Sequence, residues 1–184
     1  QLGGLDVLYV QTNDNGGSYG SKYPAALGAI TNAITNDGLV LAISNRSTVS
    51  GNGSTSPSAA LPGGASIVWA GFGGGVSNDV TILSNTIATN GPHGVIGETT
   101  LDGIGTSLHN AAQPATLPAG SVPIHGPGGT SLVSAFSYQL GTGAVVHTSN
   151  PVAAFQGNTS NSARAALNNI FMPNFLAYAK SLAS

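Results

Sequence analysis

The sequence predicts an α/β fold: a three-layer sandwich with a mostly parallel central sheet and an antiparallel hairpin at its edge. Three observations support this prediction. Short apolar runs of strand length are separated by a segment of helical periodicity. The order strand, helix, strand within about 40 residues is typical of a βαβ unit with parallel strands. Two later runs with partial alternation flank a glycine turn, as the strands of a β-hairpin do.

The N-terminal elements are the clearest. Leu5–Val10 is an apolar run that suits a strand buried on both faces, and the turn-forming segment Asn13–Gly17 follows it. Ser21 is a candidate cap for a helix that ends near Gly38, a suitable left-handed residue. The apolar residues of this helix recur at helical spacing: Ala25, Ala26, Leu27, Ala29, Ile30, Ala33 and Ile34. Leu39–Ile43 is the second predicted strand.

The middle of the chain is less regular. Residues 44–64 are rich in Ser, Gly, Asn and Pro and predict a long surface loop. A third strand is expected at Ser66–Ala70, and a short helix from Val80 to Ala88. The β-branched residues in that helix weaken its propensity. Ser121–His125 has the length and composition of a short strand.

The C-terminal part predicts a hairpin and a helix. Leu132–Tyr138 and Ala144–Thr148 are the two hairpin strands, joined at Gly141–Gly143. Ser162 is a candidate cap of the last helix, which Pro173 should kink or split in two. Neither a linker nor an internal repeat divides the chain, so residues 1–184 are expected to form a single α/β domain.

Charged residues make up only 5% of the chain, against roughly 25% in an average soluble domain. With four Lys and Arg in total, we expect no basic patch for nucleic acid or anionic lipid. The chain lacks cysteine, which excludes disulfides, Cys-zinc sites and thiol nucleophiles. No apolar run approaches the length of a membrane span, so membrane insertion is not expected. A charge-poor chain that begins with Gln indicates a mature piece of a secreted or cell-surface protein.

One loop has the composition of a metal site. Asp14 lies between Asn13 and Asn15 directly after the first predicted strand. Carboxylate, amide and backbone oxygens are the ligands of Ca²⁺, so this loop is a candidate calcium site, with a solvated turn as the alternative. Glu98 and Asp102 are four residues apart and could share a cation on a helix. No other cofactor is predicted.

No catalytic constellation is visible. Four histidines occur in four separate segments: His93, His109, His125 and His147. None has the i, i+4 spacing of a zinc motif, and His147, at a predicted strand end, could face the crevice of an α/β sheet. The run Gly71–Gly75 matches neither a dinucleotide fingerprint nor a P-loop, and a G-x-S-x-G elbow is absent. These observations favour a protein that is not an enzyme.

Parts of the sequence resemble a known family. Asp6–Val10 and Leu140–Pro151 resemble the first and a late strand of class I glutamine-amidotransferase-like domains. The second segment is similar to the G-x-G-x-V-v-y-S-s-x-P stretch of their non-enzymatic relatives. The run from Asn90 to Gly103 is similar to domains of large secreted or calcium-associated bacterial surface proteins. Together these segments span about half of the chain, and the resemblance implies a flavodoxin-like α/β sandwich.

The same resemblance implies that the activity is lost. True amidotransferases carry a Cys on a sharp strand-to-helix elbow, with a downstream His and Glu, because a thiolate must attack the amide. The corresponding position after Ser66–Ala70 reads Gly71-Phe72-Gly73, and no His-x-Glu follows.

We therefore expect a non-catalytic structural or adhesive domain of an extracellular bacterial protein, able to self-assemble through contacts that desolvate few ions. Its expected partners are other protein copies or surface glycans. Two alternatives remain. One is a hydrolase that uses Asp14, His147 or a metal. The other is a small-molecule or glycan-binding module at the strand ends, centred on Asn13–Tyr19 and Phe72.

Overall fold

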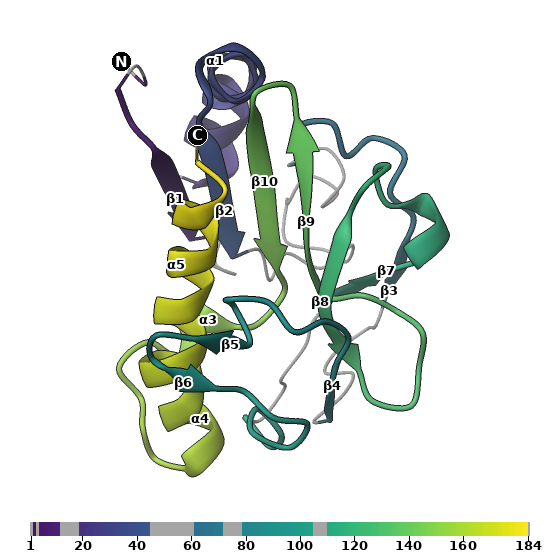
Figure 1. Ribbon diagram of the computed structural model, residues 1–184, viewed down its shortest axis with the longest axis vertical. Coiled ribbons are helices and arrows are strands. Elements are labelled where there is room, and N and C mark those ends of the chain that lie inside the picture. Colours follow the sequence, from purple (N-terminus) through teal and green to yellow (C-terminus); the bar gives the residue numbers. More distant parts are fainter. Residues whose placement is uncertain are drawn as a thin grey trace.

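The computed structural model describes residues 2, 4–11, 19–44, 61–71, 79–104 and 110–183 (Figure 1). Within them lies a six-stranded sheet with the order β1-β2-β10-β9-β8-β4. Its strands are β1 (Val7–Gln11), β2 (Val40–Ser44), β4 (Val80–Ile82), β8 (Val122–Pro127), β9 (Ala135–Leu140) and β10 (Gly143–Thr148). Two small antiparallel sheets accompany it: β3 (Trp69–Gly71) with β7 (Asn110–Ala112), and β5 (Asn90–Gly91) with β6 (Gly94–Val95).

The predicted βαβ unit is confirmed. β1 and β2 are parallel, with Val7 opposite Val40, and the helix α1 (Tyr19–Asp37) connects them. The helix begins before Ser21, so this residue is not its N-cap. Gly38 follows the helix with a φ of +77°, the left-handed conformation that the sequence predicts there.

The predicted hairpin is present, but it lies in the middle of the sheet. β9 and β10 are antiparallel neighbours, and β10 also pairs in parallel with β2. The strands β1, β2, β8 and β10 therefore run in one direction, and β9 and β4 run in the other. The sheet is mixed, and the predicted α/β class is confirmed. The edge strands are β1 and β4, and the expectation of a hairpin at the edge is wrong.

Packing against the end of α1 fixes the hairpin turn. Gly141 has a φ of +63°, as the first turn residue of a type II′ hairpin has. A Cβ atom on Gly141 would lie 2.2 Å from the carbonyl oxygen of Thr35. Thr142 Oγ1 accepts a hydrogen bond from the Gly38 N–H, and the Thr142 N–H donates to Thr35. Glycine at this turn therefore permits the close contact between hairpin and helix.

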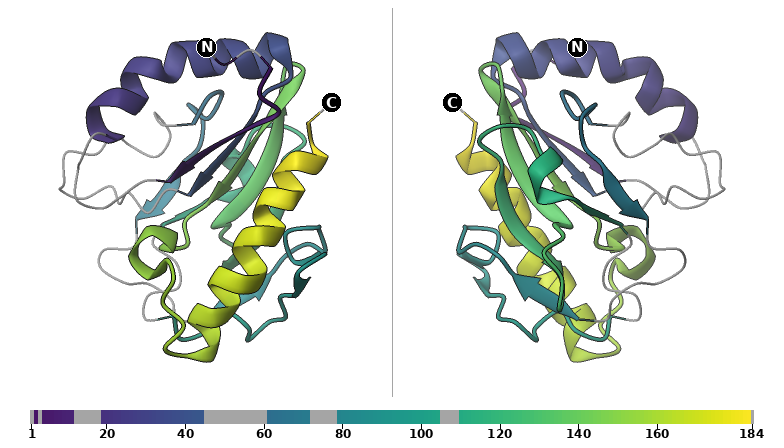
Figure 2. Two further views of the ribbon diagram at one scale, coloured as in Figure 1. Left: turned by 90° about the vertical axis from the view of Figure 1, so that its left-hand side faces the viewer. Right: turned by 90° about the vertical axis from the view of Figure 1, so that its right-hand side faces the viewer.

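Helices cover both faces of the parallel strands. Figure 2 shows the sheet close to edge-on, with α1 and the helix α5 (Met172–Ser181) on opposite sides. Alternate residues of β2 belong to two separate apolar clusters: Val40 and Ala42 pack with Phe175 of α5, and Leu41 packs with Ile34 of α1. The side-chain alternation of a strand thus produces two cores, one on each face.

The C-terminal helical run has three parts, namely α4 (Ser162–Ala166), a π-helical turn (Leu167–Phe171) and α5. Asn161, and not Ser162, caps it by accepting the Arg164 N–H at 2.8 Å. Pro173 lies in the first turn of α5, directly after the π turn. Since proline lacks an N–H group, the change in helix type at this point accommodates it within one continuous run. Two short helical pieces complete the described elements: α3 (Val152–Phe155) and a 3₁₀ turn at Pro114–Thr116.

In the middle of the chain, one prediction is wrong and another is confirmed only in part. The segment expected to be a helix from Val80 to Ala88 forms the strand β4 and an irregular stretch, in line with its β-branched residues. The strand expected at Ser66–Ala70 is the shorter β3, which pairs with β7 and not with the main sheet.

Candidate functional site

The parallel strands β1, β2 and β10 end at one place. Gln11 is opposite Ser44, and Ser44 is opposite Thr148, so the three carboxyl ends align. Ligands of open α/β sheets bind beside such ends, which makes this region the candidate site. The predicted calcium ligands Asn13, Asp14 and Asn15 lie outside the described residues, as do Phe72 and His109.

Fully buried polar side chains occupy the end of β10. Asn150 Oδ1 accepts a hydrogen bond from Thr148 Oγ1 at 2.6 Å and lies 2.9 Å from His125 Nε2. Since the amide oxygen only accepts, His125 must donate through Nε2. Ser44 Oγ donates to the carbonyl oxygen of Asn150 at 3.2 Å. The network therefore joins β2, β8 and the segment after β10.

A second group of buried hydroxyls continues this network. Ser134 Oγ and Ser149 Oγ each donate to the carbonyl oxygen of Asn110 at 2.8 Å. The Ser149 N–H donates to the Ser134 carbonyl at 3.1 Å. All three residues are at most 1% exposed. Buried polar groups that are hydrogen-bonded to one another in this way fix a single packing arrangement. The network therefore fits a structural role.

His147 is also completely buried, but in apolar surroundings. Its ring centroid lies 5.0 Å from that of Phe136 and 5.2 Å from that of Trp69. Neither ring nitrogen has a partner that meets hydrogen-bond geometry. From the sequence, this residue could face the crevice of the sheet, whereas its exposed fraction is 0%.

Burial weakens both inner histidines as bases. Loss of hydration lowers the pKa of His125 to about 4, although its bond to Asn150 opposes the shift. The same loss of hydration lowers the pKa of His147 to about 3, partly offset by the nearby Ser134 backbone and reinforced by the proximity of His125. Both rings are neutral near pH 7. A general base works best with a pKa near the operating pH, so neither ring is suited to that role.

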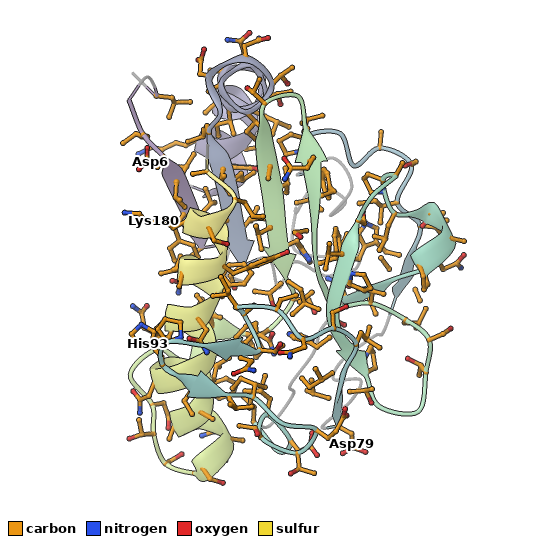
Figure 3. The ribbon with its side chains drawn as sticks, viewed as in Figure 1. Asp6, Asp79, His93 and Lys180 are labelled. Atoms are coloured by element: carbon orange, nitrogen blue, oxygen red, sulfur yellow. The ribbon has the colours of Figure 1, made fainter. Side chains whose placement is uncertain are left out.

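The described carboxylates do not converge on a histidine. Figure 3 shows Asp6 beside the start of β1 and Asp79 beside β4, at opposite ends of the molecule. Glu98 and Asp102 instead bind the backbone of β4. Asp102 Oδ1 accepts a hydrogen bond from the Val80 N–H at 2.8 Å, and Glu98 Oε2 accepts one from the Ile82 N–H at 3.2 Å. The expected helix that would let Glu98 and Asp102 share a cation is absent, because their segment forms turns.

In the described part of the chain, no three potential metal ligands of the His, Cys, Asp and Glu types gather. None of the helices described here has both the length and the hydropathy of a membrane span.

A partly open row of uncharged polar groups lies at the ends of β1 and β2. Tyr9 Oη donates to Gln11 Oε1 at 3.2 Å, and Gln11 Nε2 donates to Gln156 Oε1 at 3.3 Å. Burial raises the pKa of Tyr9 to about 12, against the opposing effect of a hydrogen bond with the Ser44 side chain. Hydroxyl and amide groups of this kind can bind neutral, hydroxyl-rich molecules, but they supply neither a nucleophile nor a strong base.

Sequence reasoning did not identify Asn150, Thr148 or Gln156 as members of these networks. One signal was present: Thr148-Ser149-Asn150 follows a buried apolar run without an intervening glycine. Gln156 becomes a neighbour of Gln11 only through the fold, since 145 positions separate them.

Comparison of the chain with protein-family models, with curated proteins and with solved structures found no match.

Proposed function

We propose that this chain is a non-catalytic structural or adhesive domain of an extracellular bacterial protein, and that it contacts other protein copies or surface glycans. The observation that carries the proposal is the burial of His147 between Trp69 and Phe136. A hydrolase that used His147 as its base would need this imidazole to reach a substrate proton at about 3 Å. A ring with 0% exposure and a lowered pKa does not meet that requirement.

The surface chemistry supports an adhesive role. The chain has four basic and six acidic residues among 184, so most contacts that it makes desolvate few ions. The row of Tyr9, Gln11 and Gln156 favours a neutral partner and keeps the glycan-binding alternative open.

We further propose that the fold is a three-layer, flavodoxin-like sandwich, related to glutamine-amidotransferase-like domains without their catalytic Cys. Support comes from the parallel β1-β2-β10 order and from apolar clusters on both faces of β2. The strand before the expected elbow, β3, belongs to a separate small sheet. A nucleophile at that position would therefore not lie at the end of a central strand.

Calcium binding by Asn13, Asp14 and Asn15 is part of the proposal, on the grounds of their oxygen-rich side chains after β1. Thermal unfolding with 1 mM CaCl₂ and with excess EDTA tests it. We expect a lower midpoint in EDTA, because a ligand that binds only the folded state stabilises it. The variant Asp14→Asn should lose most of this difference. An identical midpoint in both buffers would reject calcium.

The non-catalytic role can be tested with two assays on one preparation. Retention on insoluble cellulose, chitin and peptidoglycan measures adhesion, and hydrolysis of chromogenic esters and glycosides measures catalysis. We expect retention on at least one polymer, or self-association, and no hydrolysis above the buffer rate. Hydrolysis that His147→Phe abolishes would favour the hydrolase. A chain that neither binds a polymer nor self-associates would contradict an adhesive role.

A further inference from the structure

The two edges of the main sheet differ in how they are covered. At β4, carboxylates of Asp102 and Glu98 accept the outward N–H groups of Val80 and Ile82. At β1, no element of the described chain lies across the strand, and the left view of Figure 2 looks directly onto it. Natural sheets commonly block an edge with charge, and the five residues of β1 are uncharged.

The hydrogen-bond pattern identifies which groups of β1 are open. The Val40 N–H donates to the Asp6 carbonyl at 3.0 Å, and β1 is in parallel register with β2. In such a ladder, alternate residues bond to the neighbouring strand. Leu8 and Val10 therefore face β2 with their backbone groups, whereas Val7, Tyr9 and Gln11 present theirs to the free side.

We propose that β1 pairs with β1 of a second copy of this chain, antiparallel and about a twofold axis at Tyr9. This proposal rests on the proposed function, because it names the surface through which copies of the chain assemble. The pairing places Val7 opposite Gln11 of the second copy and Tyr9 opposite its counterpart. Three facing pairs with two hydrogen bonds each give about six backbone bonds.

The helices leave room for this arrangement. α5 packs over β1, β2 and β10, so its axis is centred near β2, and α1 packs over β2 and β10. With strands about 4.8 Å apart, β2 lies about 7 Å from the twofold axis, so the two α5 helices would be about 14 Å apart. A helix with its side chains is about 10–12 Å wide, so the helices fit beside each other.

The strand itself carries no charge, and the charged side chains of Asp6 and Lys180 lie beside it (Figure 3). The segment Val-Leu-Tyr-Val-Gln carries no ionisable group that is charged at neutral pH, and burial raises the pKa of Tyr9 to about 12. The net charge of the chain is −2, so long-range repulsion between copies is weak. An interface limited to one strand pair is below about 1,200 Å², which predicts a dissociation constant between about 10 μM and 1 mM.

Disulfide trapping tests the register of the proposed β1–β1 pairing. Because the chain has no native cysteine, any disulfide must form between the introduced cysteines. Val7→Cys and Gln11→Cys proteins are prepared separately and oxidised alone or as a mixture at 0.5 mM. The facing Cα atoms would be about 5.5 Å apart, within disulfide range. In each variant alone, the two cysteines would be about 14 Å apart.

We expect at least about tenfold more covalent dimer in the mixture than in either variant alone. Ala119→Cys, in an exposed loop before β8, is the control for random collision. Equal yields in all samples would overturn the proposed register. The absence of covalent dimer in the mixture would overturn β1 pairing altogether.

Sedimentation velocity of the unmodified chain from 10 μM to 1 mM provides the second measurement. We expect a concentration-dependent dimer, and Val7→Pro with Gln11→Pro should abolish it by removing two outward N–H groups from each copy. Circular dichroism shows whether this double variant folds. If the double variant does not fold, the cysteine experiment alone tests the β1 pairing. A monomer at every concentration would reject the pairing, whereas retention on polysaccharide would leave the adhesive function standing.

Discussion

At the scale of single residues, His147 is the most unusual side chain. Both ring nitrogens are buried without partners, which costs about 1–3 kcal/mol relative to a satisfied group. Phe has a similar shape and would contact the same rings of Trp69 and Phe136. We expect His147→Phe to increase the free energy of unfolding by about 1–2 kcal/mol and the thermal midpoint by about 2–6 °C. Urea and thermal unfolding at pH 7.5 measure both quantities.

His125→Phe is the matched control, since His125 is equally buried but bonded to Asn150. This variant should destabilise the chain by about 1–3 kcal/mol, because Asn150 loses a donor in a buried site. Destabilisation by His147→Phe would show that His147 has a bonded partner, such as an internal water.

The same two histidines predict how stability depends on pH. Their folded-state pKa values of about 4 and about 3 lie below the ordinary value of 6.5. The unfolded chain therefore binds protons first as the pH falls, and stability decreases from about pH 6.5 downward. By pH 4 each ring should have removed on the order of 3 kcal/mol. Urea midpoints from pH 7.5 to 4.5 measure the slope, which His147→Phe should reduce. An unchanged slope in this variant would contradict the assignment.

The sequence shows the residue types of the site more readily than their environment. The position of His147 near a strand end is visible from the apolar run before it. Its burial is not visible, because it depends on Trp69, which lies 78 positions earlier and contacts the ring from a separate small sheet. The partners of His125 are hidden in the same way, since Asn150 belongs to the segment after β10.

At the scale of elements, one amide fastens the β5–β6 hairpin to α5. Asn174 is fully buried; its Oδ1 accepts the His93 N–H at 3.0 Å, and its Nδ2 donates to the Gly94 carbonyl at 2.9 Å. Asn174→Ala should lower the free energy of unfolding by about 2–4 kcal/mol, because two backbone groups lose their partner. Hydrogen exchange of the His93 amide should accelerate as well. Asn36→Ala removes an exposed amide contact on α1 and should change stability by less than about 0.5 kcal/mol.

The covered edge strand β4 allows a second test at this scale. Asp102→Ala removes a charge-assisted bond to the Val80 N–H in a half-buried site, and should cost about 1–3 kcal/mol. Glu98→Ala removes a similar bond in an exposed site and should cost less than about 1 kcal/mol. Chemical denaturation gives the ranking, with Asp37→Ala as an exposed control. Equal costs would mean that solvent screening does not separate the two bonds.

The elements that sequence reasoning placed correctly are those defined by local pattern. Leu39–Ile43 and the glycine turn before Gly143 are examples, because an apolar run and a turn residue need no distant partner. β4 lies where the sequence predicts a helix, because the ladder partner that makes this segment a strand is distant in the sequence, on β8. The sequence predicts the hairpin at an edge of the sheet, whereas every residue of β10 is buried and β10 pairs on both sides.

At the scale of the whole molecule, the scarcity of charge should make stability almost independent of salt. Arg164, a described cation, donates to the Ile104 carbonyl and to Ser160, and lies 4.3 Å from the Phe155 ring, so its contacts are with uncharged groups. We expect the free energy of unfolding to change by less than about 0.5 kcal/mol between 0.05 and 0.5 M NaCl. Urea midpoints at both salt concentrations test this. A change above about 1 kcal/mol would reveal an ion-pair contribution to folding.

The central place of β10 also affects how the chain folds during synthesis. β2 leaves the ribosome about 100 residues before its parallel neighbour β10, a delay of about 5–20 s at ordinary elongation rates. Until then, the β1–α1–β2 unit exposes one long side of β2 and has no partner for it. The main sheet therefore remains incomplete from the synthesis of β2 until that of β10. During that interval the open side of β2 would be accessible to any factor that binds exposed strands.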